Sequence, residues 1–362
     1  MLTFIIYMLV LSIVICTHEL GHFIMARRNG VKVEIFSFGF GPKLFSKKGR
    51  MTEYIVCAIP FGGYVKMAGE NLQECTGKPD EYYSQPPGRR FQIIVLGPLV
   101  NYILGFLLLW FIFCVGYSRL TTKVGSLRDG YGAKLAGIEV GDKIIALDGK
   151  KVEYWEDMQQ IIQTKKSTMK VEVSFTRNNK TMTLAVPVKE ETLEDPLGKK
   201  HNVGLIGITP YDETVIVRHG FVESAFLAFN KVWDFAAITY QTIGRIVTGK
   251  MSVKSIRDSV AGPLGMFDIT RKVISLGFVA VVNFMAAISV SLAVVNLLPI
   301  PAFDGGHILL LFIEKIRGKS LSFKVEHFIT QIGFSFIIML ALIITYNDIL
   351  RLFGDKISKL IK

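Results

Sequence analysis

Residues 2–22 read LTFIIYMLVLSIVICTHELGH, and this stretch decides the fold. An uncharged run from 2 to 17 leads directly into the HExxH pattern of His18, Glu19 and His22. A helix needs about 20 apolar residues to cross a bilayer core, so the run predicts a transmembrane helix. Residues four apart share a helical face, so both imidazoles can bind one metal, with Glu19 beside them to take the proton of a metal-bound water.

Two other interpretations of this stretch are disfavoured. A signal peptide would have a basic start and a small-residue cleavage site, and neither is present. A pair of satisfied histidines at a helix end is disfavoured, because three ionisable side chains in an apolar helix are costly and are functional candidates by default. The metal site is therefore the preferred hypothesis.

Three further uncharged windows, 91–118, 273–303 and 328–347, predict three more spans. The composition agrees, because half of the 362 residues are hydrophobic and only 20% are charged. Such a balance indicates a membrane protein and excludes disorder or coiled coil as the main content. The 4 cysteines are scattered without a CxxC pair, so neither a disulfide scaffold nor a thiolate zinc site is indicated.

Positive charge predicts the orientation of these spans. Eleven Lys and Arg residues lie between positions 26 and 91, whereas none precedes residue 27. The positive-inside rule puts this segment in the cytoplasm, the N-terminus and residues 119–272 outside, and residues 304–327 inside again. The net charge of +12 is thus mainly a topology and lipid-headgroup signal, and no nucleic-acid partner is expected. We expect a multi-pass protein of the inner (cytoplasmic) membrane, with its active site near the cytoplasmic side.

The segments between the spans are not alike. Residues 31–66 alternate and are punctuated by glycines, which predicts two or three short apolar strands associated with the membrane. Residues 121–190 read as a small α/β domain, with a hairpin turn at Asn178-Asn179. Residues 191–203 are charged and loop-like, and residues 222–247 are predicted to form an interfacial amphipathic helix, or else an ordinary surface helix.

A catalytic zinc needs a third protein ligand and an open position. Asp304 is the best candidate, within NLLPIPAFDGGH at residues 296–307. The first and third spans both run inward, so their cytoplasmic ends can meet. Two prolines break the helix before Asp304, and Gly305-Gly306 allows a tight turn that directs the carboxylate inward. Two alternatives are that Asp304 only caps a short helix, and that His307 is the ligand instead.

These motifs together resemble the site-2 protease family of intramembrane zinc metalloproteases, and most closely the bacterial type that cleaves anti-sigma factors. HELGH near the N-terminus and NLLPIPAFDGG in the third span carry the resemblance, which covers nearly the whole chain. FGFGP at 38–42 and PFGGYVK at 60–66 are similar to the family's membrane-associated β-loop, and GPLVN at 97–101 to its second-span motif. AGI at 136–138 with GDKI at 141–144 resembles a PDZ domain. Phe303 stands where the family usually has Leu, and one PDZ-like domain is found where some relatives have two.

The resemblance implies hydrolysis of a peptide bond in or near the transmembrane segment of single-span membrane proteins, such as anti-sigma factors or remnant signal peptides. One zinc per chain would be held by His18, His22 and Asp304, with Glu19 as the catalytic residue. The substrate backbone would be held by Asn296 and Asn101, whose alternative role is helix–helix hydrogen bonding, and by the β-loop at Gly62 and Gly63.

The β-loop could also accept an unwound substrate by strand addition. The PDZ-like domain could bind peptide termini or exclude bulky ectodomains. Rival hypotheses are a catalytically inactive membrane adaptor that presents the PDZ-like domain, and a metal transporter. An intact Glu19 counts against the first, and the clustering of polar residues at one depth counts against the second.

The expected fold is therefore a polytopic α-helical membrane protein with about four transmembrane helices, a membrane-associated β-loop and an inserted PDZ-like α/β domain. Its expected parts are helix 1 with HExxH (1–26), the cytoplasmic-side β-loop (27–90), helix 2 (91–118), the extracytoplasmic PDZ-like domain (119–200), a linker with the amphipathic helix (201–272), helix 3 leading into the DG motif (273–303), a cytoplasmic loop (304–327), helix 4 (328–347) and a tail (348–362).

Overall fold

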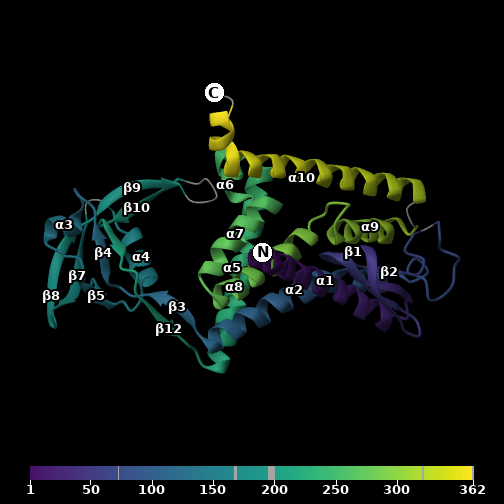
Figure 1. The fold of residues 1–362 in the computed structure, drawn as a ribbon, viewed down its shortest axis with the longest axis horizontal. Coiled ribbons are helices and arrows are strands. Elements are labelled where there is room, and N and C mark those ends of the chain that lie inside the picture. The colour runs from purple at the N-terminus through teal and green to yellow at the C-terminus, as the bar shows by residue number, and fades with distance from the viewer. Residues whose placement is uncertain (72, 167–168, 195–199, 320–321, 361–362) are drawn as a thin grey trace. The chain divides into compact units, whose positions relative to one another are not determined.

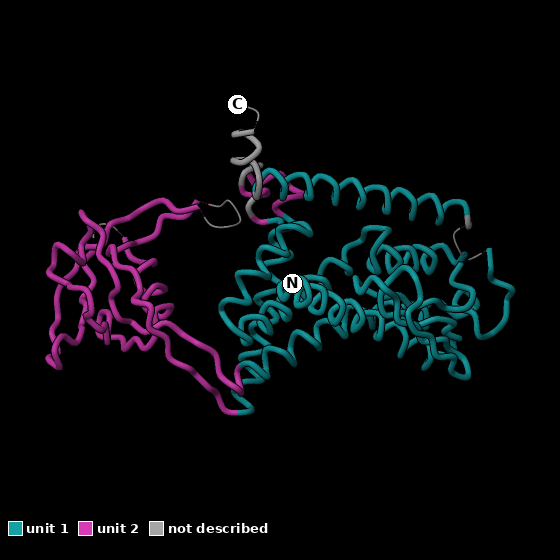
Figure 2. Tube along the Cα trace, in the orientation of Figure 1, with its two compact units in different colours: residues 1–112, 221–244, 260–362 teal, residues 113–220, 245–259 magenta. Residues whose placement is uncertain are grey.

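The computed structural model describes residues 1–71, 73–166, 169–194, 200–319 and 322–360. The chain forms two compact units, which Figure 2 distinguishes by colour. The membrane unit comprises residues 1–112, 221–244 and 260–362, and the inserted unit comprises residues 113–220 and 245–259.

Among the described residues, four helices of the membrane unit are long and apolar enough to cross a membrane (Figure 1), as the four uncharged windows predict. The first continues through the HExxH pattern to Arg28, so the motif lies within one unbroken helix. The four helices are α1 (Leu2–Arg28), α2 (Pro87–Val115), α8 (Phe278–Asn296) and α10 (Phe323–Leu360).

The third and fourth spans differ from the predicted boundaries. The window 273–303 is interrupted by Gly277, whose φ of 98° ends one helix and begins α8, and residues 297–303 form turns. The prolines at 299 and 301 explain the second break, because proline cannot continue a helix. Residues 348–360 extend α10 instead of forming a tail, since the helical pattern continues past the last apolar turn.

The predicted strands of residues 31–66 form one long antiparallel hairpin of β1 (Val33–Lys48) and β2 (Glu53–Met67). Its register shifts repeatedly, and Gly39, Gly41 and Gly62 have positive φ, which glycine adopts without strain. Strand β2 lies along α1, where the Cys16 thiol contacts the carbonyl oxygen of Gly62 at 3.5 Å. This contact positions the hairpin beside the helix that carries HExxH.

The segment between the hairpin and α2 folds around one carboxylate. Glu81 is 6% exposed, and its carboxylate accepts hydrogen bonds from three consecutive backbone N–H groups, one hydroxyl and one thiol. Hydrogen bonds, led by that from Thr76, lower its pKa to about 2. The donors are Thr76 N (2.8 Å), Gly77 N (2.9 Å), Lys78 N (3.2 Å), Thr76 Oγ1 (2.6 Å) and Cys75 Sγ (3.2 Å).

This loop should therefore open in acid. A depressed folded-state pKa means that the stabilisation by Glu81 is complete above the ordinary carboxyl value of about 4.3 and is lost as pH falls towards 2. Hydrogen exchange of residues 73–85, followed from pH 5 to pH 2, should show protection declining across this window in the parent. In Glu81→Gln the protection should already be low at pH 5. Equal profiles for the two proteins would contradict this role.

The inserted unit contains a four-stranded sheet of order β6-β5-β7-β8, covered by α4 (Trp155–Gln163). Alternate residues of the central strands, such as Ile144, Val173 and Phe175, are fully buried in its core. Asn178 and Asn179 connect β7 to β8 with φ of 49° and 61°, as the hairpin signal predicts. The bounds are β5 (Lys143–Leu147), β6 (Lys150–Lys151), β7 (Lys170–Arg177), β8 (Lys180–Pro187) and α3 (Gly132–Ala136).

The inserted unit extends beyond the predicted end at residue 200. Residues 191–203, predicted as a loop, belong to a hairpin of β9 and β10, and residues 195–199 lie outside the described part. Backbone pairing of the two strands forms despite the charged composition that predicts a loop. A side-chain hydrogen bond from Thr192 Oγ1 to Asn202 Oδ1, at 2.8 Å, also joins them. The remaining pairs are β4 with β11 and β3 with β12. The bounds are β3 (Tyr117–Leu120), β4 (Val124–Leu127), β9 (Lys189–Glu194), β10 (Lys200–Leu205), β11 (Ile208–Pro210) and β12 (Thr214–Val217).

Four further helices occupy segments predicted mostly as linker or loop. Helix α5 (Phe221–Val247) matches the predicted amphipathic helix, and Phe226, Phe229 and Trp233 are exposed along it. The predicted cytoplasmic loop 304–327 contains a complete helix, which begins at Asp304. The other three are α6 (Val253–Ser259), α7 (Pro263–Ser275) and α9 (Asp304–Arg317).

Candidate metal centre

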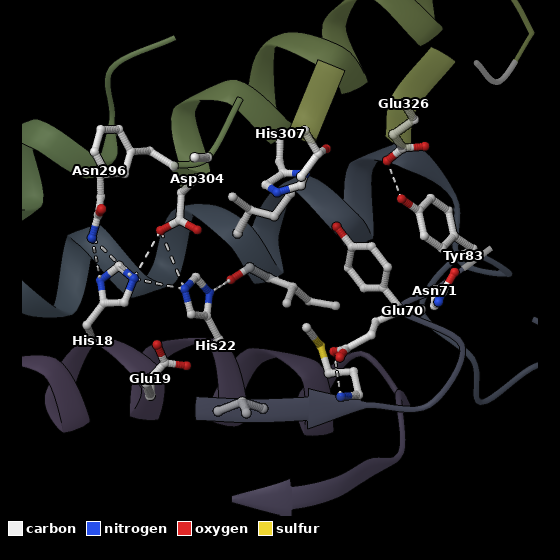
Figure 3. Close-up of a pocket in the computed structure, with 18 of the residues that line it drawn as sticks. His18, Glu19, His22, Glu70, Asn71, Tyr83, Asn296, Asp304, His307 and Glu326 are labelled. Atoms are coloured by element: carbon white, nitrogen blue, oxygen red, sulfur yellow. Dashed lines mark hydrogen bonds and ion pairs between the residues drawn. The ribbon is translucent and has the colours of Figure 1, made fainter. Parts of the chain in front are cut away.

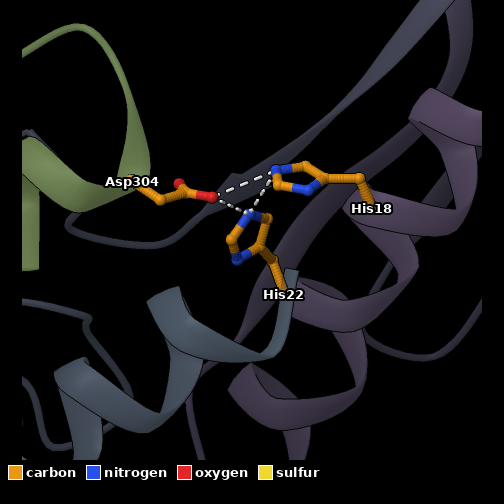
Figure 4. A group of neighbouring side chains, drawn as sticks. All are labelled: His18, His22 and Asp304. Atoms are coloured by element: carbon orange, nitrogen blue, oxygen red, sulfur yellow. Dashed lines mark hydrogen bonds and ion pairs between the residues drawn. The ribbon is translucent and has the colours of Figure 1, made fainter. Parts of the chain in front are cut away.

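Helix α1 presents His18 and His22 on one face, one helical turn apart. Their Nε2 atoms are 3.1 Å apart, and each lies close to the Oδ2 atom of Asp304, at 3.1 Å from His18 and 3.5 Å from His22. Figure 4 shows the three side chains converging from α1 and α9. The three side chains are largely buried, with 9%, 12% and 18% of their surfaces exposed.

Asp304 reaches the histidines because the chain turns back sharply before α9. A Cβ added to Gly305 would lie 2.3 Å from the carbonyl oxygen of Leu298, and one added to Gly306 would lie 2.3 Å from that of Ile300. Only glycine allows so close a backbone approach. Asp304 is the first residue of α9, whose N-cap is Phe303 without a side-chain cap, so the structure does not show the capping role considered above.

Helix α2 forms the wall of the site behind the histidines. The backbone carbonyl of Ile93 lies 2.9 Å from Nδ1 of His22, so Nδ1 donates a proton there and Nε2 is left with its lone pair towards Asp304. A Cβ on Gly97 would lie 2.4 Å from His22 Nε2, and a Cβ on Gly21 would lie 2.4 Å from the Leu96 carbonyl oxygen. Two glycines thus let α1 and α2 approach closely at the metal-binding face.

The residues present fit a zinc ion. Ligands about 2.0 Å from a tetrahedral ion stand roughly 3.3 Å from one another, and the three measured separations are 3.1, 3.1 and 3.5 Å. Oδ2 of Asp304 is buried and faces the Nε2 atoms of both histidines, so one cation could be bound by all three atoms. Two imidazoles and one carboxylate form a donor set that zinc prefers. Among the described residues these are the one such group of three.

The three residues lie in a cavity of about 740 Å³, drawn in Figure 3. Glu19 lines it from α1, and Val65 lines it from β2. Asn296 also lines it, with its amide nitrogen 3.4 Å from both ring nitrogens of His18. His307 lines the cavity but lies outside the group of three.

The other residues predicted to bind substrate do not line this cavity. Asn101 is fully buried and its side-chain atoms have no hydrogen-bond partner in the described chain, while its backbone carbonyl accepts from Ser289 of α8 at 2.8 Å. Gly62 and Gly63 lie against α1 near Cys16, and a Cβ on Gly63 would lie 3.2 Å from the thiol. Both glycines therefore lie beside α1, on the part of β2 that precedes the cavity-lining residues Val65 and Met67.

Several cavity residues were not found by sequence reasoning. Met67 comes from the end of β2, and Ile93 comes from α2. At the end far from the metal group, the Tyr83 hydroxyl hydrogen-bonds Glu326 of α10. No motif or spacing marks these residues, because chain segments far apart bring them together.

The family model described as Peptidase family M50 matches residues 6–340. The regulator of sigma-W protease RasP of Bacillus subtilis is 28% identical, with 97% of this chain and 99% of that protein covered. A Clostridium acetobutylicum protein whose name proposes a zinc metalloprotease is 35% identical over 95% of this chain and 96% of its own length. The solved PDZ domain of an SdrC-like protein from Listeria monocytogenes is 23% identical, covers 25% of this chain and 86% of its own, and has a TM-score of 0.21.

Proposed function

This chain belongs to peptidase family M50, the site-2 protease family of metalloproteases, and on that premise we propose that it cleaves single-span membrane proteins in or near their transmembrane segments. The observation that carries the proposal is the group of His18, His22 and Asp304, with Glu19 in the same cavity, built largely from helices able to span a membrane. The name of the Bacillus subtilis relative concerns sigma-W regulation, so membrane-bound anti-sigma factors are the first substrates to test.

His18, His22 and Asp304 would hold one zinc ion per chain. The ion would supply Lewis-acid polarisation of the scissile carbonyl and of the attacking water. Glu19 accepts the proton of that water as its oxygen attacks the carbonyl carbon, and then returns the proton to the leaving amine nitrogen as the C–N bond breaks. Glu19 follows His18 directly on α1 and lines the same cavity as both histidines. Asn296 lines the cavity and would bind the substrate backbone.

A transmembrane substrate is helical, so its carbonyl groups are protected until it unwinds locally. The hairpin of β1 and β2 lies beside α1 and offers backbone groups to an unwound strand, with Gly62 and Gly63 on the strand nearest the motif. Asn101 lies where α2 meets α8. It would either position these two helices or bind the substrate backbone after a local rearrangement. The inserted unit is proposed to act as a PDZ-like domain that binds peptide termini or excludes folded ectodomains.

The proposed membrane topology follows the charge distribution. The N-terminus and the inserted unit lie outside, and the metal centre lies near the cytoplasmic side of an inner membrane. The eleven basic residues between positions 26 and 91 support this orientation. The alternative of an inactive adaptor is disfavoured, because a binding protein has no need of a carboxylate held beside the metal-binding face.

Metal removal tests this function directly. Purified full-length protein should cleave a single-span anti-sigma factor, lose that activity on chelation and regain it with about one equivalent of zinc. The loss should reach the background rate, because the carbonyl would no longer be polarised. Cleavage that persists in the metal-free protein, or that zinc does not restore, would contradict the proposal. Zinc binding at one per chain without cleavage of any single-span substrate would favour the adaptor.

A further inference from the structure

A buried ion pair lies outside the metal group, at the base of α2. Arg90 is 4% exposed, and its Nη2 atom lies 2.6 Å from Oε1 of Glu314 in α9. The side chains of the pair are 5% and 15% exposed. Burying two charges is expensive, so a pair in this position calls for a reason beyond stability.

Arg90 also contacts the segment that precedes α2. Its Nε atom donates to the backbone carbonyl of Gln85 at 3.1 Å, and its guanidinium lies over the ring of Tyr83, 5.4 Å from the ring centre. Arginine suits such a place, because its planar fork can bind a carboxylate and a carbonyl while its face stacks on an aromatic ring. One side chain therefore joins α2, α9 and the loop that lines the cavity.

The elements joined by this pair are those that shape the metal centre. Helix α2 supplies Ile93, whose carbonyl orients His22, and Gly97, which lies against both imidazoles. Helix α9 begins at Asp304 and carries Glu314 ten residues later, about 15 Å along the axis. The N-terminal end of α9 is held by the glycine turn, and the Arg90 pair holds it near the other end, so both the tilt and the rotation of α9 are constrained.

We propose that the Arg90–Glu314 ion pair is a positioning device that sets α9 against α2, so that the Asp304 carboxylate meets the two histidines at zinc-binding distance. The inference rests on the proposed metal site and names two residues that act on it through other groups. Without the pair, α9 keeps its glycine turn but loses the contact that fixes its rotation. Asp304 then samples positions in which Oδ2 does not face the imidazoles.

Zinc affinity of the full-length protein, measured by competition with a chromophoric chelator, tests this proposal. The main variant is Arg90→Met with Glu314→Leu, which removes both charges and fills the space with apolar side chains. Such a replacement of a buried pair is often neutral or stabilising, so it separates positioning from stability. We expect zinc binding to weaken roughly 10- to 100-fold, as when outer groups around a metal are lost. The melting temperature of the metal-free protein should be close to that of the parent.

Two further variants make the result decisive. Arg90→Lys keeps the charge but cannot bind Glu314, Gln85 and Tyr83 together, so it should show an intermediate loss of zinc affinity. This variant tests the proposal even if the double variant does not fold. Asp348→Asn is the matched control. Asp348 is fully buried in the same unit and accepts a hydrogen bond from Gly265 N at 2.7 Å, away from α9. It should lower the melting temperature and leave zinc affinity unchanged.

Parent-like zinc affinity in the double variant or in Arg90→Lys would overturn the inference, and so would an equal loss of affinity in Asp348→Asn. A parent that binds no zinc would instead refute the proposed metal site itself. The two failures are thus distinguishable. The absorption spectrum of the cobalt-loaded protein provides a second readout, because a displaced Asp304 alters the coordination geometry without requiring any cleavage assay.

Discussion

Glu19→Gln should reduce peptide cleavage by about 10²- to 10⁴-fold while zinc stays bound at one per chain. The amide has almost the size of the carboxylate but cannot accept the proton of the attacking water. Glu19 lies outside the group of His18, His22 and Asp304, so the metal-binding atoms keep their geometry. The measurement is the single-turnover cleavage rate of a single-span substrate, together with the zinc content of the same sample.

A control and a contrasting variant sharpen this test. Glu53→Gln changes a partly exposed carboxylate of β2 that binds Lys43 and Ser46, and cleavage should continue at the parent rate. Asp304→Asn should instead lose both zinc and activity. Cleavage by Glu19→Gln at the parent rate would show that the proton is taken by another group or that the activity comes from a contaminant.

Gly97→Ala should abolish zinc binding, and cleavage with it. The new Cβ would lie 2.4 Å from Nε2 and Cε1 of His22 and 2.9 Å from Cε1 of His18, distances at which the rings must move. The neighbouring atoms belong to rings held on α1, and His22 is also tied to the carbonyl of Ile93. The displaced ring is that of His22, whose Nε2 would bind the metal. A single methyl group at position 97 should therefore weaken zinc binding as strongly as the removal of a ligand. Zinc affinity and the cleavage rate check it.

Two other glycines of α2 provide the controls. Gly88 has open space around it, so Gly88→Ala should keep both zinc and activity. At Gly105 a Cβ would lie 2.5 Å from Val290 Cγ2 of α8, so Gly105→Ala should loosen helix packing and lower the melting temperature while zinc remains bound. Zinc loss in Gly105→Ala as complete as in Gly97→Ala would mean that general destabilisation, and not contact with His22, empties the site.

The local features of this protein could be predicted from its sequence. The spacing of His18 and His22 places them on one helical face, and the structure has their Nε2 atoms 3.1 Å apart. The four apolar windows, the Asn178-Asn179 hairpin and the strands of residues 31–66 follow from patterns that repeat every few residues. Periodicity of this kind reports on neighbours along the chain. For this reason the sequence pattern predicts a loop both at residues 191–203 and at residues 304–327, where α9 contains glycines and follows two prolines, and offers a helix after Asp304 only as an alternative.

Contacts between distant segments were decided only by the tertiary structure. Nothing in the sequence pairs Arg90 with Glu314, which is 224 residues away, or places Ile93 on His22. For Asn101 the sequence leaves substrate binding and helix–helix hydrogen bonding open; the side chain lies fully buried on α2, and the backbone carbonyl accepts a hydrogen bond from Ser289 of α8. The physical reason is that a helix's own pattern says which residues share a face, whereas the neighbour that each face meets depends on how closely the helices approach. Here glycines at positions 21, 97, 105, 305 and 306 permit that approach.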